Sequence, residues 1–237
     1  MLTARIHSFQ SLGTVDGPGV RSVVFMQGCP LRCVCCHNPD TWDAHGGTEM
    51  TVDALMKKIL RCRAYFGKNG GVTVSGGEPL LHSAFLVELF RQLKINGIHT
   101  ALDTSGCFLN DATDTLLDVT DLVLLDYKYT NAEDYLRYTG MKMETVDRFL
   151  DHLQDVGKPT WLRHVYIPGL NDTDDSIRRL IEVKRTHSCV QKIELLPFRR
   201  LCLEKYQSMG LTFPLADTPE PTPEQITALR QKFKELK

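Results

Sequence analysis

The sequence lacks a second cysteine pair. Of its eight cysteines, four stand alone and far apart, at Cys62, Cys107, Cys189 and Cys202. A structural zinc site usually takes four ligands from two separated C-x2-C pairs. The pattern therefore disfavours a zinc finger or ribbon, although a zinc-binding interaction module stays open as the non-enzymatic alternative.

The chain also lacks any excess of charge and any long apolar run. Its 28 basic and 29 acidic residues leave a net charge of −1, which argues against a general binder of nucleic acid. No apolar stretch approaches the ~20 residues of a membrane span. The first residues carry no apolar core of a secretory signal, so we expect a cytoplasmic protein with reduced thiols.

Half of the cysteines fall between residues 29 and 36, and three of them form a C-x3-C-x2-C run: Cys29, Cys33 and Cys36. Three thiolates on one short loop can hold three irons of a [4Fe–4S] cube. The fourth iron then stays open, and an open metal position is typical of a catalytic site. The run therefore predicts a catalytic iron–sulfur cluster.

Hydrophobic periodicity predicts alternating strands and helices along the chain. Strands are expected at 20–27, 71–75, 100–103, 122–127, 160–167 and 192–196. Helices are expected at 51–66, 84–96, 110–119, 143–156, 171–186 and 223–237. The alternation predicts an α/β fold with a mostly parallel sheet, two units short of an eightfold barrel. We expect one domain over 1–237, with an N-terminal segment 1–19 and a C-terminal linker and helix at 214–237.

Chemically distinctive residues follow several of these predicted strands. They are the cysteine loop, Ser75–Glu78, Asp103–Gly106 and Asp126–Lys128. In parallel α/β folds the chemistry lies at the C-terminal ends of the strands. The sequence therefore predicts that these motifs contribute to one site.

Several short segments, in the same order along the chain, resemble the pyruvate formate-lyase-activating enzyme family of the radical S-adenosylmethionine (SAM) superfamily. These segments are Thr14–Gly19, Gln27–Cys29, Cys36–Trp42, Ser75–Glu78 and Lys192–Pro197. The resemblance covers nearly the whole chain and implies an open, partial (β/α)6 barrel. It also implies one [4Fe–4S] cluster on Cys29, Cys33 and Cys36, with SAM at the open iron.

The resemblance assigns the SAM contacts to three groups of residues. Gly76, Gly77 and Glu78 would bind the amino group of the methionine moiety, because glycines admit a close approach and a carboxylate suits an ammonium. Lys128, within Asp126-Tyr127-Lys128, would face the SAM carboxylate and ribose. Cys36 and His37, which lie in the cysteine loop, form the third group of cofactor-binding residues.

The sequence departs from the family pattern at two of these positions. The family places an aromatic residue at Cys35, where it stacks near the adenine, so we interpret Cys35 as a small residue in the adenine wall. Arg199 stands where the family has a histidine that contacts SAM, and a SAM contact through Arg199 is retained as a hypothesis.

Two further sites follow from the resemblance alone. Asp103, Thr104 and Asp126 match residues that bind a monovalent cation. Thr14, Asp16 and Gly17 match the mouth through which the glycyl loop of the partner enters, where Asp16 would hydrogen-bond the peptide backbone.

The activity implied is reductive cleavage of SAM and generation of a glycyl radical on pyruvate formate-lyase, with flavodoxin or ferredoxin as electron donor, under anaerobic or oxygen-limited conditions. An activase of another glycyl radical enzyme or of anaerobic ribonucleotide reductase is the alternative. A small-molecule radical SAM enzyme, such as a deazaguanine synthase, is less compatible with the Thr14–Gly19 segment.

Overall fold

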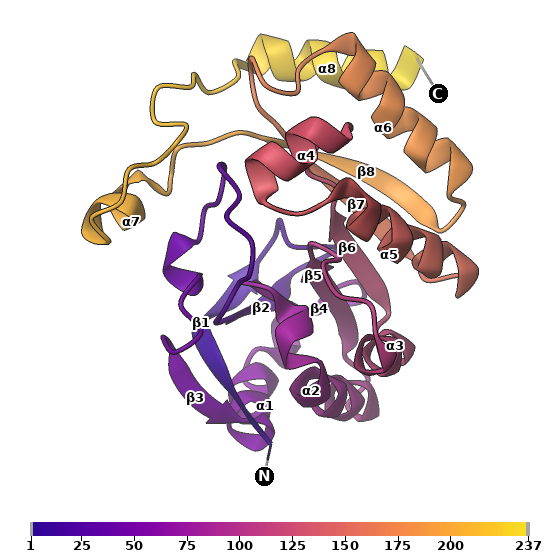
Figure 1. Cartoon of the computed structure of the whole chain (residues 1–237). Coiled ribbons are helices and arrows are strands. Elements are labelled where there is room, and N and C mark those ends of the chain that lie inside the picture. The colour runs from indigo at the N-terminus through magenta and orange to yellow at the C-terminus, as the bar shows by residue number, and fades with distance from the viewer. Residues whose placement is uncertain (1, 236–237) are drawn as a thin grey trace. The chain divides into compact units, whose positions relative to one another are not determined.

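The structure, a computed structural model, describes residues 2–235 of the 237-residue chain. It divides into two compact units. Figure 1 shows the ribbon coloured by residue number. The N-terminal unit comprises residues up to 30 together with 41–125. The C-terminal unit comprises residues 31–40 together with those from 126 onward. Each unit is described by itself.

The N-terminal unit is built on a sheet with strand order β3-β1-β2-β4-β5-β6. The strands are β1 (Thr3–Gly13), β2 (Arg21–Met26), β3 (Thr48–Thr51), β4 (Gly71–Gly76), β5 (His99–Thr104) and β6 (Leu122–Asp126). Strands β2, β4, β5 and β6 run parallel, whereas β1 pairs antiparallel with both β2 and β3. The parallel strands are nearly continuous runs of buried residues, as expected for strands covered on both faces.

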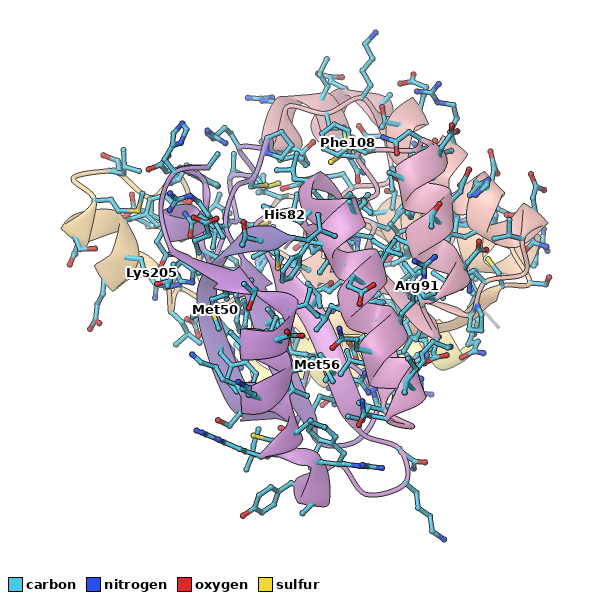
Figure 2. The ribbon with its side chains drawn as sticks, turned by 90° about the horizontal axis from the view of Figure 1, so that it is seen from below. Met50, Met56, His82, Arg91, Phe108 and Lys205 are labelled. Carbon is cyan, nitrogen blue, oxygen red and sulfur yellow. The ribbon has the colours of Figure 1, made fainter. Side chains whose placement is uncertain are left out.

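Three helices belong to this unit: α1 (Val52–Leu60), α2 (Ser83–Ile95) and α3 (Asp111–Asp118). Helix α2 contacts both α1 and α3. Figure 2 shows Met56 on α1 and Arg91 on α2; Met56 is buried and Arg91 is exposed. The Asn110 side chain caps α3 by accepting hydrogen bonds from the amides of Ala112 and Thr113.

The C-terminal unit contains two parallel strands, β7 (Thr160–Tyr166) and β8 (Val190–Pro197). Its helices are α4 (Ala132–Thr139), α5 (Met143–Asp155), α6 (Asp174–Thr186), α7 (Leu203–Ser208) and α8 (Pro223–Glu235). Helices α6 and α8 pack on this strand pair through Tyr166, Ile177 and Leu229. Thr222 and Gln225 form a capping box at the start of α8, since they exchange side-chain to backbone hydrogen bonds.

The structure confirms the α/β class, the six predicted strands and the six predicted helices, and all boundaries but one agree within about three residues. The exception is the helix predicted over 51–66: α1 ends at Leu60 and a separate 3-10 helix follows at Arg63–Tyr65. Among strands and α-helices of the described residues, the structure adds β1, β3, α4 and α7. Strand β1 was not predicted because most residues of its C-terminal half are exposed, without a regular alternation of buried and exposed positions. Strand β3 was not predicted because it has only four residues. The single-domain expectation stays a prediction, and the end of the last predicted helix, at residues 236–237, lies outside the described residues. Within residues 2–235, no helix has the length and apolar character to span a membrane.

Candidate functional site

The end of β2 meets the end of β4 through backbone hydrogen bonds that continue the parallel ladder. The Gly77 amide donates to the Met26 carbonyl at 3.0 Å, and the Glu78 amide donates to the Gly28 carbonyl at 2.8 Å. This pairing places Gly28 and Cys29 directly beside Gly77. A Cβ atom on Gly77 would lie 2.1 Å from the Gly28 carbonyl oxygen, so no other residue fits there.

The carboxylate of Glu78 is buried and accepts four hydrogen bonds. Oε1 receives the Thr104 hydroxyl at 2.6 Å and the Leu80 amide at 3.0 Å. Oε2 receives the Ser105 hydroxyl at 2.5 Å and the Ser105 amide at 3.0 Å. A carboxylate offers about four lone-pair sites, and these donors use them. Glu78 therefore joins the end of β4 to the end of β5.

The cysteine loop continues into the C-terminal unit, where it is fastened to α4. The Arg32 amide donates to the Thr139 carbonyl at 3.2 Å, and the Val34 amide donates to the Tyr138 carbonyl at 2.9 Å. The last carbonyls of a helix have no partner inside the helix, so the loop satisfies the end of α4. Cys33 and Cys36 are also linked, since the Cys36 amide donates to the Cys33 carbonyl at 3.1 Å.

The residues after Cys36 are held by the segment that follows β8. The Nε2–H of His37 donates to the Arg199 carbonyl at 2.7 Å. The Lys205 ammonium, labelled in Figure 2, donates to the Asn38 amide oxygen at 2.9 Å and pairs with Asp40 at 3.0 Å. These contacts fix both the backbone direction and the exit of the loop.

The electrostatics of the C-terminal unit centre on Lys128. Its ammonium lies 2.7 Å from the Asp126 carboxylate. Burial disfavours the charged form of both side chains, but their mutual attraction outweighs this effect. The pKa of Lys128 therefore lies well above the ordinary value for lysine, and the pKa of Asp126 lies below the ordinary value for aspartate. Burial raises the pKa of the Cys33 thiol to about 11 and that of Cys35 to about 12, and the Lys128 charge acts in the opposite direction.

Comparison with known proteins identifies the family. The model of the radical SAM superfamily matches residues 23–181. A protein named pyruvate formate-lyase-activating enzyme from Clostridium pasteurianum is 44% identical over 237 residues, which cover 100% of this chain and 99% of the relative. One of the same name from Staphylococcus aureus (strain USA300) is 43% identical and covers 96% and 94%. The chain belongs to the radical SAM superfamily, in the family of the pyruvate formate-lyase-activating enzymes.

A solved structure supports the fold of this radical SAM chain. The structure of Streptococcus suis SuiB bound to S-adenosylmethionine matches with a TM-score of 0.68 at 13% identity, over 87% of this chain and 44% of SuiB. The expected radical SAM fold, a partial α/β barrel, is thereby confirmed. Membership of the superfamily implies a [4Fe–4S] cluster and SAM as cofactors.

The residues of this radical SAM enzyme fit such a cluster. Within residues 2–235, no three His, Cys, Asp or Glu side chains converge closely enough to hold one metal ion. A cube does not need that convergence, because each thiolate binds a different iron. The Tyr129 hydroxyl, which interacts electrostatically with Cys35 and Cys33, is buried without a hydrogen-bond partner in the described part of the chain. A buried polar atom without a protein partner suits a site at which a further group binds.

The remaining predicted residues have identifiable surroundings. Asp103 accepts a hydrogen bond from Ser75 at 2.6 Å, so the predicted cation ligands Asp103 and Thr104 both contact β4 or its following loop. The third, Asp126, belongs to the C-terminal unit and pairs with Lys128. The cation site stays a prediction.

Two predicted SAM contacts also have partners within the C-terminal unit. The Arg199 guanidinium lies 2.8 Å from the Glu220 carboxylate. The Tyr127 hydroxyl donates to Asp147 at 2.8 Å, and the Tyr127 carbonyl contacts the Nδ1 of His164 at 2.7 Å. Both residues stay predictions as SAM contacts.

The sequence analysis did not predict several contacts that shape the site. Thr104 was predicted only as a cation ligand and Ser105 only as part of the Asp103–Gly106 motif, whereas both fix Glu78; Lys205, which fixes the exit of the cysteine loop, was not predicted at all. Cys107 was not predicted as a site residue either: burial raises the pKa of its thiol, as do the charges of Glu78 and Cys29 nearby. The position of Ser105 at a strand end was a usable signal, whereas nothing in the sequence pairs Lys205 with Asn38, 167 residues away.

Proposed function

We propose that this chain cleaves SAM reductively and generates a glycyl radical on pyruvate formate-lyase. The observation that carries the proposal is the identity of 43–44%, over nearly the full length, to proteins named for that activity. A cluster held by Cys29, Cys33 and Cys36 would supply one electron to the sulfonium of SAM, which would break the S–C5′ bond to give methionine and a 5′-deoxyadenosyl radical; that radical would take a hydrogen atom from a glycine Cα of the partner, giving 5′-deoxyadenosine and the glycyl radical. Flavodoxin or ferredoxin is the electron donor in this proposal.

The chain contributes positioning and charge to this reaction. Cys29, Cys33 and Cys36 hold the cluster, and the α4 contacts keep the loop in one conformation. Thiolates, not thiols, are metal ligands, and the Lys128 ammonium favours the deprotonated form of Cys33. Gly76, Gly77 and Glu78 are proposed to bind the amino group of the methionine moiety of SAM. Cys35 is proposed to lie in the adenine wall.

The glycyl loop of the partner is proposed to enter over Thr14, Asp16 and Gly17. Thr14 is exposed, and its neighbour Val15 is 67% exposed. Gly17 has φ +115°, a conformation that favours glycine. We place the reaction in the cytoplasm under anaerobic or oxygen-limited conditions, with Asp103, Thr104 and Asp126 as the proposed monovalent cation ligands.

The test is an anaerobic activation assay. The reconstituted, reduced chain is mixed with SAM and pyruvate formate-lyase, the electron paramagnetic resonance spectrum is recorded, and 5′-deoxyadenosine is measured. A glycyl radical doublet with a matching amount of deoxyadenosine is expected. Deoxyadenosine without the doublet would point to another glycyl radical enzyme or anaerobic ribonucleotide reductase. If a chain with a loaded cluster forms neither the glycyl radical nor deoxyadenosine, the proposal is overturned.

The ligand assignment has its own test in two adjacent cysteines. We expect Cys36→Ala to lose cluster binding and Cys35→Ala to retain it, because adjacent thiols are poorly placed to bind one cube together. Iron and sulfide contents of the two reconstituted variants measure the difference. The reverse outcome would assign the ligand to Cys35 instead.

A further inference from the structure

The N-terminal unit contains a buried arginine that the proposed reaction does not use. Arg21, the first residue of β2, has 0% of its surface exposed. Its Nε donates to the Thr73 hydroxyl at 2.7 Å, Nη1 to the Pro18 carbonyl at 3.0 Å and Nη2 to the Val72 carbonyl at 2.7 Å. Nη2 also contacts Nδ1 and the carbonyl of His99, at 3.2 and 3.3 Å. The guanidinium is thus surrounded by neutral acceptors.

Burying a charged side chain costs free energy unless hydrogen bonds compensate for the lost water. Burial lowers the pKa of Arg21 to about 10, while the charges of Asp16 and Asp121 oppose that shift. The side chain therefore stays charged at neutral pH. A charged guanidinium needs its hydrogen bonds when it is removed from water, and its rigid fork makes them in one arrangement only.

The hydrogen bonds of Arg21 converge on the segment 14–19. Pro18 is held directly through its carbonyl. Asp16 is held indirectly, because the Thr73 hydroxyl that accepts from Arg21 donates in turn to the Asp16 carbonyl at 2.6 Å. The segment also packs on the side chain: a Cβ on Gly17 would lie 3.3 Å from Cδ of Arg21.

The far end of the segment is fixed by the backbone itself. Gly19 has φ +70°, and a Cβ there would lie 2.6 Å from the Gly70 nitrogen. The Gly71 amide donates to the Val20 carbonyl at 3.2 Å. The segment 14–19 is therefore held by the hydrogen bonds of Arg21 and Thr73 to its carbonyls, and at its C-terminal end by contacts with Gly70 and Gly71. Thr14 and Val15 are exposed.

We propose that Arg21 is a positioning residue, which acts through Thr73 to hold the segment 14–19 in the conformation that receives the partner's glycyl loop. The inference rests on the proposed function, because that function makes the segment a peptide-binding surface. Arg21 is buried, and the hydrogen bonds described above all join it to residues of the N-terminal unit. Its loss should weaken recognition of the partner without weakening the cleavage of SAM.

Thr73→Val is the sharpest test, because it removes both hydrogen bonds of the hydroxyl and nearly preserves the volume. On the reconstituted chain we expect amide hydrogen exchange in residues 14–19 to accelerate at least tenfold. With pyruvate formate-lyase as substrate we expect KM to rise about tenfold and kcat to change less than twofold. Deoxyadenosine formed without the partner should be unchanged. Arg21→Lys should act in the same direction, because an ammonium cannot reproduce the fork.

Thr160→Val is the matched control, a buried strand threonine of β7 whose hydroxyl donates to the Lys158 carbonyl. It should leave exchange in 14–19 and the KM unchanged. Unaltered exchange in Thr73→Val, or an unaltered KM despite faster exchange, would overturn the proposal. Amide hydrogen exchange is measured without the partner. If the wild-type chain does not activate pyruvate formate-lyase, the proposed function is refuted, but the effect of Thr73→Val on the segment 14–19 can still be measured.

Discussion

Replacement of Glu78 by glutamine tests whether the carboxylate mainly stabilises the fold or mainly binds SAM. The substitution keeps the shape but replaces one acceptor oxygen with an NH2 group. If Oε2 is replaced, the hydroxyl and the amide of Ser105 lose their acceptor, and the Ser105 amide faces another donor. If the side chain flips, the Leu80 amide and the Thr104 hydroxyl lose their acceptor instead. Either orientation leaves buried donors unsatisfied.

The size of the effect follows from these contacts. A hydrogen bond to a charged group contributes about 1.5–3 kcal/mol, and an unsatisfied buried group costs about 1–3 kcal/mol. The hydroxyls can rotate to other acceptors, so we expect a net loss of about 3 kcal/mol in the free energy of unfolding for Glu78→Gln. For a chain of this size that corresponds to a fall in Tm of roughly 6–12 °C.

The assay is thermal unfolding of the cluster-free chain, followed by circular dichroism, together with SAM binding to the reconstituted chain. Glu49→Gln is the control, because Glu49 is exposed and accepts a hydrogen bond from Thr3; its change should stay within about 0.5 kcal/mol. A Glu78→Gln chain with unchanged Tm and lost SAM binding would refute the structural role and make the carboxylate a direct ligand contact.

Two further predictions concern backbone space and protonation. Gly77→Ala should destabilise the chain by about 3 kcal/mol in urea unfolding, because its Cβ would meet the Gly28 carbonyl; Gly157→Ala, with φ +64° and open space, should cost only about 1 kcal/mol, and equal losses would contradict this. Burial lowers the pKa of His164, so its neutral form is favoured by folding, and its contribution to stability is complete above pH ~6.5 and declines as the pH falls below that value. His164→Gln keeps a donor for the Tyr127 carbonyl and should show a smaller loss of Tm between pH 7 and pH 5.5; an identical pH dependence would count against this reasoning.

Local patterns were sufficient to predict most of the fold from the sequence. The strand β6 is a run of four buried residues, and α3 begins at a capping asparagine, so neighbouring residues alone determine these elements. Helix α4 also carries local signals that were overlooked, namely Asn131 as N-cap and Gly140 in the left-handed conformation at its end. Short elements of this kind compete poorly with the longer periodic segments beside them.

The candidate site could be predicted only in part, because its motifs are local but its supports are not. The cysteine run and Gly76-Gly77 are short contiguous sequence motifs and can be recognised directly. Only the pairing of β2 with β4 explains why position 77 needs glycine, since a Cβ there would meet the Gly28 carbonyl. The four donors around Glu78, the role of Arg21 and the link from Lys205 to Asn38 depend on contacts between distant segments. No periodicity or spacing encodes them.

The anchoring of the cysteine loop has a consequence for the order of events during synthesis. The cysteines are translated early, but the chain must grow by 167 further residues between Asn38 and Lys205. At about 5–20 residues per second this interval lasts roughly 10–30 s. The contacts with α4 can form once Tyr138 and Thr139 have been made, whereas those with Arg199 and Lys205 wait for the end of this interval. The cysteine loop is therefore fully fastened only in a nearly finished chain, and a ribosome stalled before the last strand carries a loop without its contacts to Arg199 and Lys205.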